Sequence, residues 1–156
     1  MCLHAVSRSE IMTAKEDMVV FKCLEKKEGR YFAPIKPLYE YIIGQSYQLA
    51  DSLNRIDDIG YYCYVDEKSA IKDFAIFDKD DIIAKFIIPK GSQYYTGTFN
   101  QEQGKAIVSD TVVFDSIVGY PLERAKKLNI NLEKCTYFSS KNFVTLKGRK
   151  QGESDV

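Results

Sequence analysis

The densest apolar pattern in the chain runs from Asp81 to Asp115. Pro89-Lys90-Gly91 ends the first apolar run, because proline cannot donate a hydrogen bond to a strand ladder and glycine permits a tight turn. The pattern predicts three or four short strands, arranged as a meander or as packed antiparallel ribbons that need a helix or a second sheet to cover them. The predicted strands occupy residues 82–88, 94–98, 106–108 and 111–114.

Shorter apolar runs before this region predict further strands. Met18–Leu24 and Arg30–Phe32 flank the turn-forming stretch Lys26–Gly29, which is typical of a hairpin. Tyr39–Ile43 and Tyr61–Val65 have strand composition as well. The segment 45–58 fits a short helix or a strand followed by a polar loop equally well, because short apolar runs do not separate the two.

Two segments have the pattern of an amphipathic helix. Asp66 is a good N-cap for a helix over 67–77, and Pro121 suits the first turn of a second helix. Their apolar faces contain Ala70, Ile71, Phe74, Ala75 and Phe77 in the first helix, and Leu122, Ala125 and Leu128 in the second. With two further strands expected at 135–138 and 143–146, the fold class is α+β, a twisted and mostly antiparallel sheet with two short helices.

The ends of the chain differ from its centre. Residues 1–15 are polar and irregular and predict a flexible N-terminal arm, and the polar residues 148–156 predict a disordered tail. Between them, residues 16–147 form a single globular domain, since no linker or repeat divides them.

Composition narrows the classes of function. Lys and Arg together number 22, equal to Asp and Glu, and this zero net charge argues against general nucleic-acid binding or binding to an anionic membrane. No apolar run reaches the roughly 20 residues that a membrane-spanning helix needs. The four cysteines are widely spaced and the start lacks the apolar segment of a secretory signal, so we expect reduced thiols and a cytoplasmic location.

Three stretches resemble a set of small uncharacterised proteins encoded by gut bacteria and their phages. They are the opening Met1-Cys2-Leu3-His4, the lead Ala14-Lys15-Glu16-Asp17, and FIIPKGSQYYTG, followed by Ser109-Asp110. The resemblance covers about residues 1–115 and implies no particular activity. It implies a phage-derived accessory or counter-defence protein.

The order of three elements is similar to the ADP-ribosyltransferase fold. The strand 60–65, the helix 66–77 and the strand-turn 82–91 follow one another as in those domains. The motifs of that family are degenerate here: Ser-Thr-Ser is missing from the middle strand, and Gln101-Glu102-Gln103 does not match Gln-x-Glu. The alternative function is therefore an enzyme related to this fold, with Asp110 and Asp115 as the remaining acids.

The N-terminus offers a candidate metal site. With Met1 removed, the free amine of Cys2, two backbone nitrogens and the imidazole of His4 have the arrangement that binds Cu(II) or Ni(II) in a square plane. A plain terminal segment explains the same residues. The aspartates between 57 and 81 match no calcium loop and fit solvated turns and a cap.

Paired tyrosines on two predicted strands give the main binding hypothesis. Alternation places Tyr62 and Tyr64 on one strand face, and Tyr94-Tyr95 follow the turn that contains Lys90. Core packing accounts for part of this set, and the rest predicts an aromatic patch with Lys90 and Asp110 supplying charged contacts. The sequence thus favours a non-catalytic module that binds a protein or a small molecule, with no catalytic residue and no cofactor expected.

Overall fold

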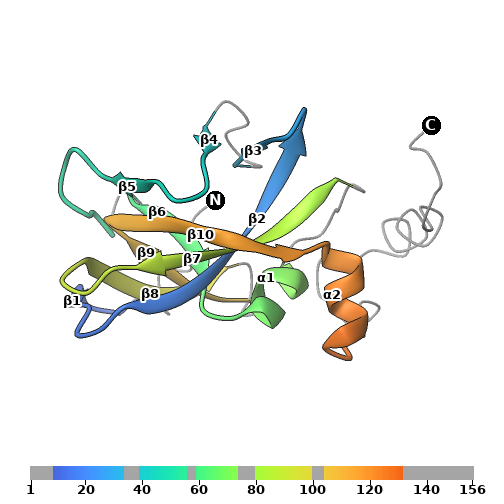
Figure 1. Cartoon of the computed structure of the whole chain (residues 1–156). Helices are drawn as coiled ribbons and strands as arrows, with labels where there is room; N and C mark the ends of the chain where they lie inside the picture. The colour runs from blue at the N-terminus through green and yellow to red at the C-terminus, as the bar shows by residue number, and fades with distance from the viewer. Residues whose placement is uncertain (1–8, 34–38, 56–58, 74–79, 100–103, 132–156) are drawn as a thin grey trace.

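One twisted antiparallel sheet and two short helices make up the described part of the protein (Figure 1). The computed structural model describes residues 9–33, 39–55, 59–73, 80–99 and 104–131. The strands are β1 (Met12–Thr13), β2 (Met18–Lys27), β3 (Arg30–Phe32), β4 (Glu40–Tyr41), β5 (Ser46–Gln48), β6 (Tyr61–Tyr64), β7 (Asp81–Ile88), β8 (Gln93–Phe99), β9 (Gly104–Ser109) and β10 (Thr111–Gly119), and the helices are α1 (Glu67–Asp73) and α2 (Pro121–Lys127). This architecture is consistent with the predicted α+β class.

The sheet is built around β2 and β7. Its main path runs β1-β8-β9-β6-β2-β7-β10-β5. Off this path, β3 pairs with the C-terminal residues of β2, and β4 pairs with β3. β2 and β7 pair along eight residues each, from Met18↔Ile88 to Glu25↔Asp81. By contrast, β2 and β6 pair only at Phe21↔Tyr64, so the two strands separate beyond this point.

The two ends of the sheet approach each other at Asp110, the single residue between β9 and β10. Its backbone N–H donates to the Gln93 carbonyl at 3.0 Å, and its carbonyl accepts from the Leu49 N–H at 2.9 Å. Gln93 belongs to β8 near one end of the sheet, and Leu49 directly follows β5 at the other. The sheet therefore curls strongly, in keeping with the twist that antiparallel strands accumulate.

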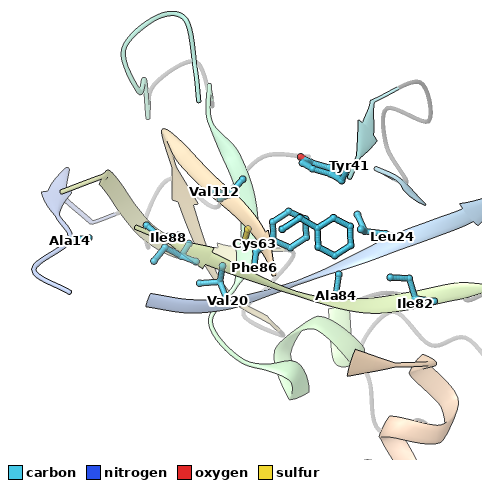
Figure 2. Packing of buried hydrophobic residues seen from close by; sticks show 12 residues of the cluster. Ala14, Val20, Leu24, Tyr41, Cys63, Ile82, Ala84, Phe86, Ile88 and Val112 are labelled. Atoms are coloured by element: carbon cyan, nitrogen blue, oxygen red, sulfur yellow. The ribbon is translucent and has the colours of Figure 1, made fainter. Parts of the chain in front are cut away.

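Each face of the sheet carries its own hydrophobic core. Alternation along β7 sends Ile82, Ala84, Phe86 and Ile88 to one face and Ile83 to the other. The face with Ile83 is covered by Ala70, Ile71 and Ala125 of the two helices, and we call it the helix-side core. The opposite face packs beneath Tyr41 of β4, and we call it the β4-side core; Figure 2 shows Tyr41 over the ring of Phe86.

Both predicted helices begin where the sequence indicates. The Asp66 carboxylate accepts a hydrogen bond from the Ser69 N–H at 2.7 Å, as an N-cap should, and Pro121 occupies the first turn of α2. Glu67 and Arg124 form a two-bond ion pair that ties α1 to α2. Three positions predicted on the apolar face of the first helix lie outside the described residues: Phe74, Ala75 and Phe77.

Each strand predicted within the described residues is present, and the predicted hairpin of β2 and β3 is confirmed. Glu28 and Gly29 have φ of 53° and 75°, which is the turn that joins a two-residue hairpin, and β2 and β3 flank it as expected. The ambiguous segment 45–58 contains the strand β5, not a helix, over its described part. β8 and β9 form a hairpin, but β7 pairs with β2 and β10, so the stretch 81–115 is not a simple meander.

The described part of the predicted N-terminal arm is attached to the sheet. Met12 and Thr13 pair with Tyr94 and Gln93, Ala14 is only 2% exposed, and the Ser9 N–H donates to the Thr96 carbonyl. The prediction of a flexible arm is therefore wrong for residues 9–14, because this segment forms backbone hydrogen bonds with β8. Residues 1–8, the expected strands after residue 134 and the tail 148–156 lie outside the described residues.

Candidate functional site

The four tyrosines predicted to form one patch are divided between the two cores. Tyr64 and Tyr95 are buried in the helix-side core and Tyr62 packs against it, whereas Tyr94 packs against the β4-side core. The prediction of one shared surface is wrong, because adjacent strand residues point to opposite faces and both faces of this sheet are covered. Tyr95 is 0% exposed, so it is a packing residue here.

Lys90 and Asp110 lie at the same end of the sheet but serve different roles from those expected. The Lys90 side chain is exposed, and its backbone N–H donates to Asp17 Oδ1 at 2.8 Å within the β7–β8 turn. Asp110 Oδ1 accepts from the Gln93 N–H and the Thr111 hydroxyl, each at 3.1 Å. The carboxylate of Asp110 is thus used to hold the β9–β10 corner.

The predicted metal ligands Cys2 and His4 lie outside the described residues. Within the described ranges, no group of three or more His, Cys, Asp or Glu residues is arranged to hold a metal ion. Of the aspartates weighed as a cation site, Asp66 caps α1 and Asp81 is buried in β7.

The structure brings together a different set of aromatics, which we call the tyrosine cluster: Tyr39, Tyr41, Tyr47 and Tyr61. They come from β4 and the residue before it, from β5 and from β6. The Tyr41 ring lies 5.0 Å from the rings of both Tyr39 and Tyr47, and the Tyr39 ring lies 6.2 Å from that of Tyr61. These are the tilted and edge-on contacts that aromatic quadrupoles favour.

Burial varies steeply across the tyrosine cluster. Tyr41 is 4% exposed and rests on Phe86 at 5.1 Å, so it forms the floor, whereas Tyr39 is 36% exposed. Ile42 and Ile43, which follow Tyr41 in the chain, are 46% and 48% exposed. The cluster is therefore a surface patch with a buried aromatic base.

Hydroxyl groups within the tyrosine cluster are linked to each other and to the backbone. The Tyr39 and Tyr61 hydroxyls lie 3.0 Å apart, and the Tyr47 hydroxyl accepts from the Ile42 N–H at 2.7 Å. Burial raises the pKa of Tyr41 and of Tyr61 above their ordinary value, and the hydrogen bond to Tyr39 adds to the rise in the pKa of Tyr61. The phenols of Tyr41 and Tyr61 therefore stay protonated near pH 7.

The amine of a lysine lies close to the buried ring of the tyrosine cluster. Lys22 lies in β2 between Val20 and Leu24, two residues of the β4-side core, and its Nζ donates to the Tyr62 carbonyl of β6. Lys22 therefore bridges the place where β2 and β6 separate. Its Nζ lies 5.5 Å from the centroid of the Tyr41 ring, within cation–π range.

The environment of Lys22 disfavours its charged form. Burial lowers the pKa of the ammonium, opposed in part by the nearby thiols of Cys63 and Cys23. Burial also raises the pKa of the Cys63 thiol. No carboxylate of the described residues forms an ion pair with Lys22, although the residue as a whole is partly exposed.

One sequence signal for this site is a lysine at an apolar position of a strand. Val20, Lys22 and Leu24 share one face by strand alternation, so a lysine stands at an apolar position. Tyr39 and Tyr41 are related by the same period, but only the folded chain brings Tyr47 and Tyr61 to them. The tyrosine cluster was not predicted because its members are far apart in the sequence.

A hollow lies at the β2–β3 hairpin. It measures about 550 Å³ and is open to solvent, and its lining includes Lys26, Lys27 and Arg30. Two of these cations are already paired, Lys27 with Glu25 at 3.6 Å and Arg30 with Glu40 at 2.6 Å. Glu28 and Asp80 also line the hollow, so its charge is mixed.

Comparison with known proteins adds no assignment. The chain has no match among the family models, the curated proteins or the solved structures with which it was compared. Within the described ranges, neither helix has the length and apolar character required to cross a membrane.

Proposed function

We propose that the protein is a non-catalytic binding module and that the tyrosine cluster is its ligand-contacting surface. The observation that carries this proposal is the gathering of three incompletely buried tyrosines, Tyr39, Tyr47 and Tyr61, with the buried ring of Tyr41. Tyrosine gives a large apolar contact area together with a polar hydroxyl, and it is enriched where proteins bind partners.

The interior alone does not require this arrangement. The β4-side core is already closed by Phe86, Phe114 and Tyr41, which are each no more than 4% exposed. Tyr39 packs outside that layer and remains 36% exposed, although its ring contacts three other tyrosines. Rings that are ordered by neighbours yet open to solvent lose little conformational entropy when a ligand binds.

A protein or a small molecule is the expected class of ligand, and the resemblance to phage-encoded proteins suggests an accessory or counter-defence role in the cytoplasm. The alternative, an enzyme related to the ADP-ribosyltransferase fold, has no support from the residues described. β6, α1 and β7 follow in the order expected for that fold, but β2 separates β6 from β7 in the sheet.

Fragment binding tests the proposal. A set of small aromatic compounds is screened against the protein by ligand-observed NMR, and the hits are measured again with Tyr39→Ala and Tyr120→Ala. Tyr120 is a matched control, since it is 40% exposed and lies at the start of α2. We expect hits that lose affinity in Tyr39→Ala and keep it in Tyr120→Ala. Equal loss in both variants, or the absence of hits, would contradict the proposal.

A further inference from the structure

We propose that Lys22 is a nucleophilic amine that condenses reversibly with the carbonyl group of a small aromatic aldehyde or ketone held on the tyrosine cluster. This inference rests on the proposed function, because it assigns the ligand class of the same surface. It is carried by three features of Lys22: its place on an apolar face, its distance from the Tyr41 ring and its partial exposure.

The position of Lys22 is unusual for an ordinary surface lysine. Neighbours on its own strand face, Val20 and Leu24, are 1% and 0% exposed. Its Nζ is held by a neutral acceptor, the Tyr62 carbonyl, and by the face of the Tyr41 ring. A lysine that stabilised the fold through its charge would be expected to face a carboxylate, whereas these partners also suit a neutral amine.

The groups that face Lys22 come from three strands. Tyr41 approaches from β4, the Tyr62 carbonyl and Cys63 from β6, and Cys23 is its neighbour on β2. Burial outweighs the opposing effect of the two thiols and lowers the pKa of the ammonium. A larger share of neutral amine at neutral pH follows, and this is the form that attacks a carbonyl carbon.

The condensation balances without any further reagent. The neutral amine of Lys22 gives its lone pair to the carbonyl carbon, and the electrons of the C=O bond move to oxygen, which takes a proton from solvent. The nitrogen loses a proton, and the carbinolamine then expels water to leave a C=N bond. One carbonyl compound and one lysine thus yield one imine and one water, and hydrolysis reverses the step.

The tyrosine cluster supplies an aromatic surface that can hold such a ligand close to the amine. The ring centroids of Tyr39 and Tyr47 each lie 5.0 Å from that of Tyr41, and the Lys22 Nζ lies 5.5 Å from the same centroid. An aromatic ring stacked at this surface would place a substituent within reach of the amine. This proximity replaces a bimolecular encounter with a local one.

Reductive trapping tests the inference on the full chain. The protein is incubated with benzaldehyde and cyanoborohydride at neutral pH, and peptide mapping measures the rate of labelling at every lysine. We expect labelling at Lys22 to be severalfold faster than at the exposed Lys90, because burial lowers the pKa of the Lys22 ammonium and the tyrosine cluster holds the aldehyde close to the amine. We also expect benzyl alcohol, which has the ring without the carbonyl, to slow labelling at Lys22 alone.

Two variants make the outcome specific. Lys22→Arg keeps a cation but cannot condense, so trapping at this position is lost, while Lys90→Arg serves as the matched control. Tyr39→Ala should slow labelling of Lys22 severalfold and leave Lys90 unchanged. Labelling of Lys22 no faster than that of Lys90, or labelling insensitive to Tyr39→Ala, overturns the inference. If benzyl alcohol still binds the tyrosine cluster in that case, the proposed function stands and only the role of Lys22 fails.

Discussion

Tyr41 shows at the scale of one residue how the site combines stability with chemistry. Its ring contacts the rings of Phe86, Tyr39 and Tyr47, and the Lys22 Nζ lies 5.5 Å from its centroid. A phenylalanine would fill the same space, but the phenol adds a hydroxyl that stays protonated because burial raises its pKa. One buried residue therefore supports both the β4-side core and the exposed rings above it.

The phenols of the tyrosine cluster predict a pH dependence. Tyr41 and Tyr61 have a folded-state pKa raised above the unfolded value of about 10, so they stabilise the fold fully below that pH, and this contribution is lost as pH rises through the folded-state pKa. Ultraviolet titration of the 11 tyrosines should show a late group that ionises together with unfolding. A single smooth titration near pH 10 with no loss of structure would contradict the burial of these phenols.

Gly60 is a second residue whose identity is fixed by packing. A Cβ added there would lie 2.3 Å from Val108 Cγ1 and 2.7 Å from Leu53 Cδ1, both in the helix-side core. Gly60→Ala should lower the free energy of unfolding by about 1–3 kcal/mol, measured by urea denaturation. In the double variant with Val108→Ala the two losses should be less than additive, because the clashing methyl is gone. Strict additivity would show that the close approach is relieved elsewhere.

At the scale of elements, the β9–β10 corner decides the path of the sheet. Asp110 receives hydrogen bonds from β8 and from the residue after β5 through its side chain and backbone, and the Ser109 hydroxyl donates to the Gln93 and Thr111 carbonyls at 3.2 and 2.9 Å. These contacts let one residue redirect the chain from β9 to β10, which lies on the other side of β6, β2 and β7. These hydrogen bonds give the corner a structural role.

Substitution of Asp110 distinguishes a structural role from the binding role predicted from the sequence. Asp110→Ala should lower the free energy of unfolding by about 1–2 kcal/mol, because the Gln93 N–H loses its carboxylate acceptor, and Asp110→Asn should cost less since it keeps an oxygen. Lys90→Ala should change stability little, as its side chain is exposed. Stability is measured by thermal and chemical unfolding. If Asp110→Ala left stability unchanged and impaired ligand binding, the result would support the ligand-binding role predicted from the sequence.

At the scale of the whole molecule, local patterns predicted the elements and long-range contacts decided the site. Strand composition located β2, β6, β7 and β8, and the cap at Asp66 and Pro121 located the helices, because these signals are contained in a few neighbouring residues. Pairing order was not predictable, since β7 lies between β2 and β10, which are far apart in sequence. For the same reason the patch expected from Tyr62, Tyr64, Tyr94 and Tyr95 is divided, and the tyrosine cluster was missed.

The most direct test of the account is to observe the tyrosine rings while a ligand binds. Protein with ¹³C-labelled tyrosine is titrated with benzyl alcohol, and ring signals are assigned with single Tyr→Phe variants. We predict saturable shifts at Tyr39, Tyr41, Tyr47 and Tyr61 and none at Tyr95 or Tyr120. Shifts that do not saturate, or that are largest at Tyr95 or Tyr120, would contradict the claim that the tyrosine cluster is the binding surface.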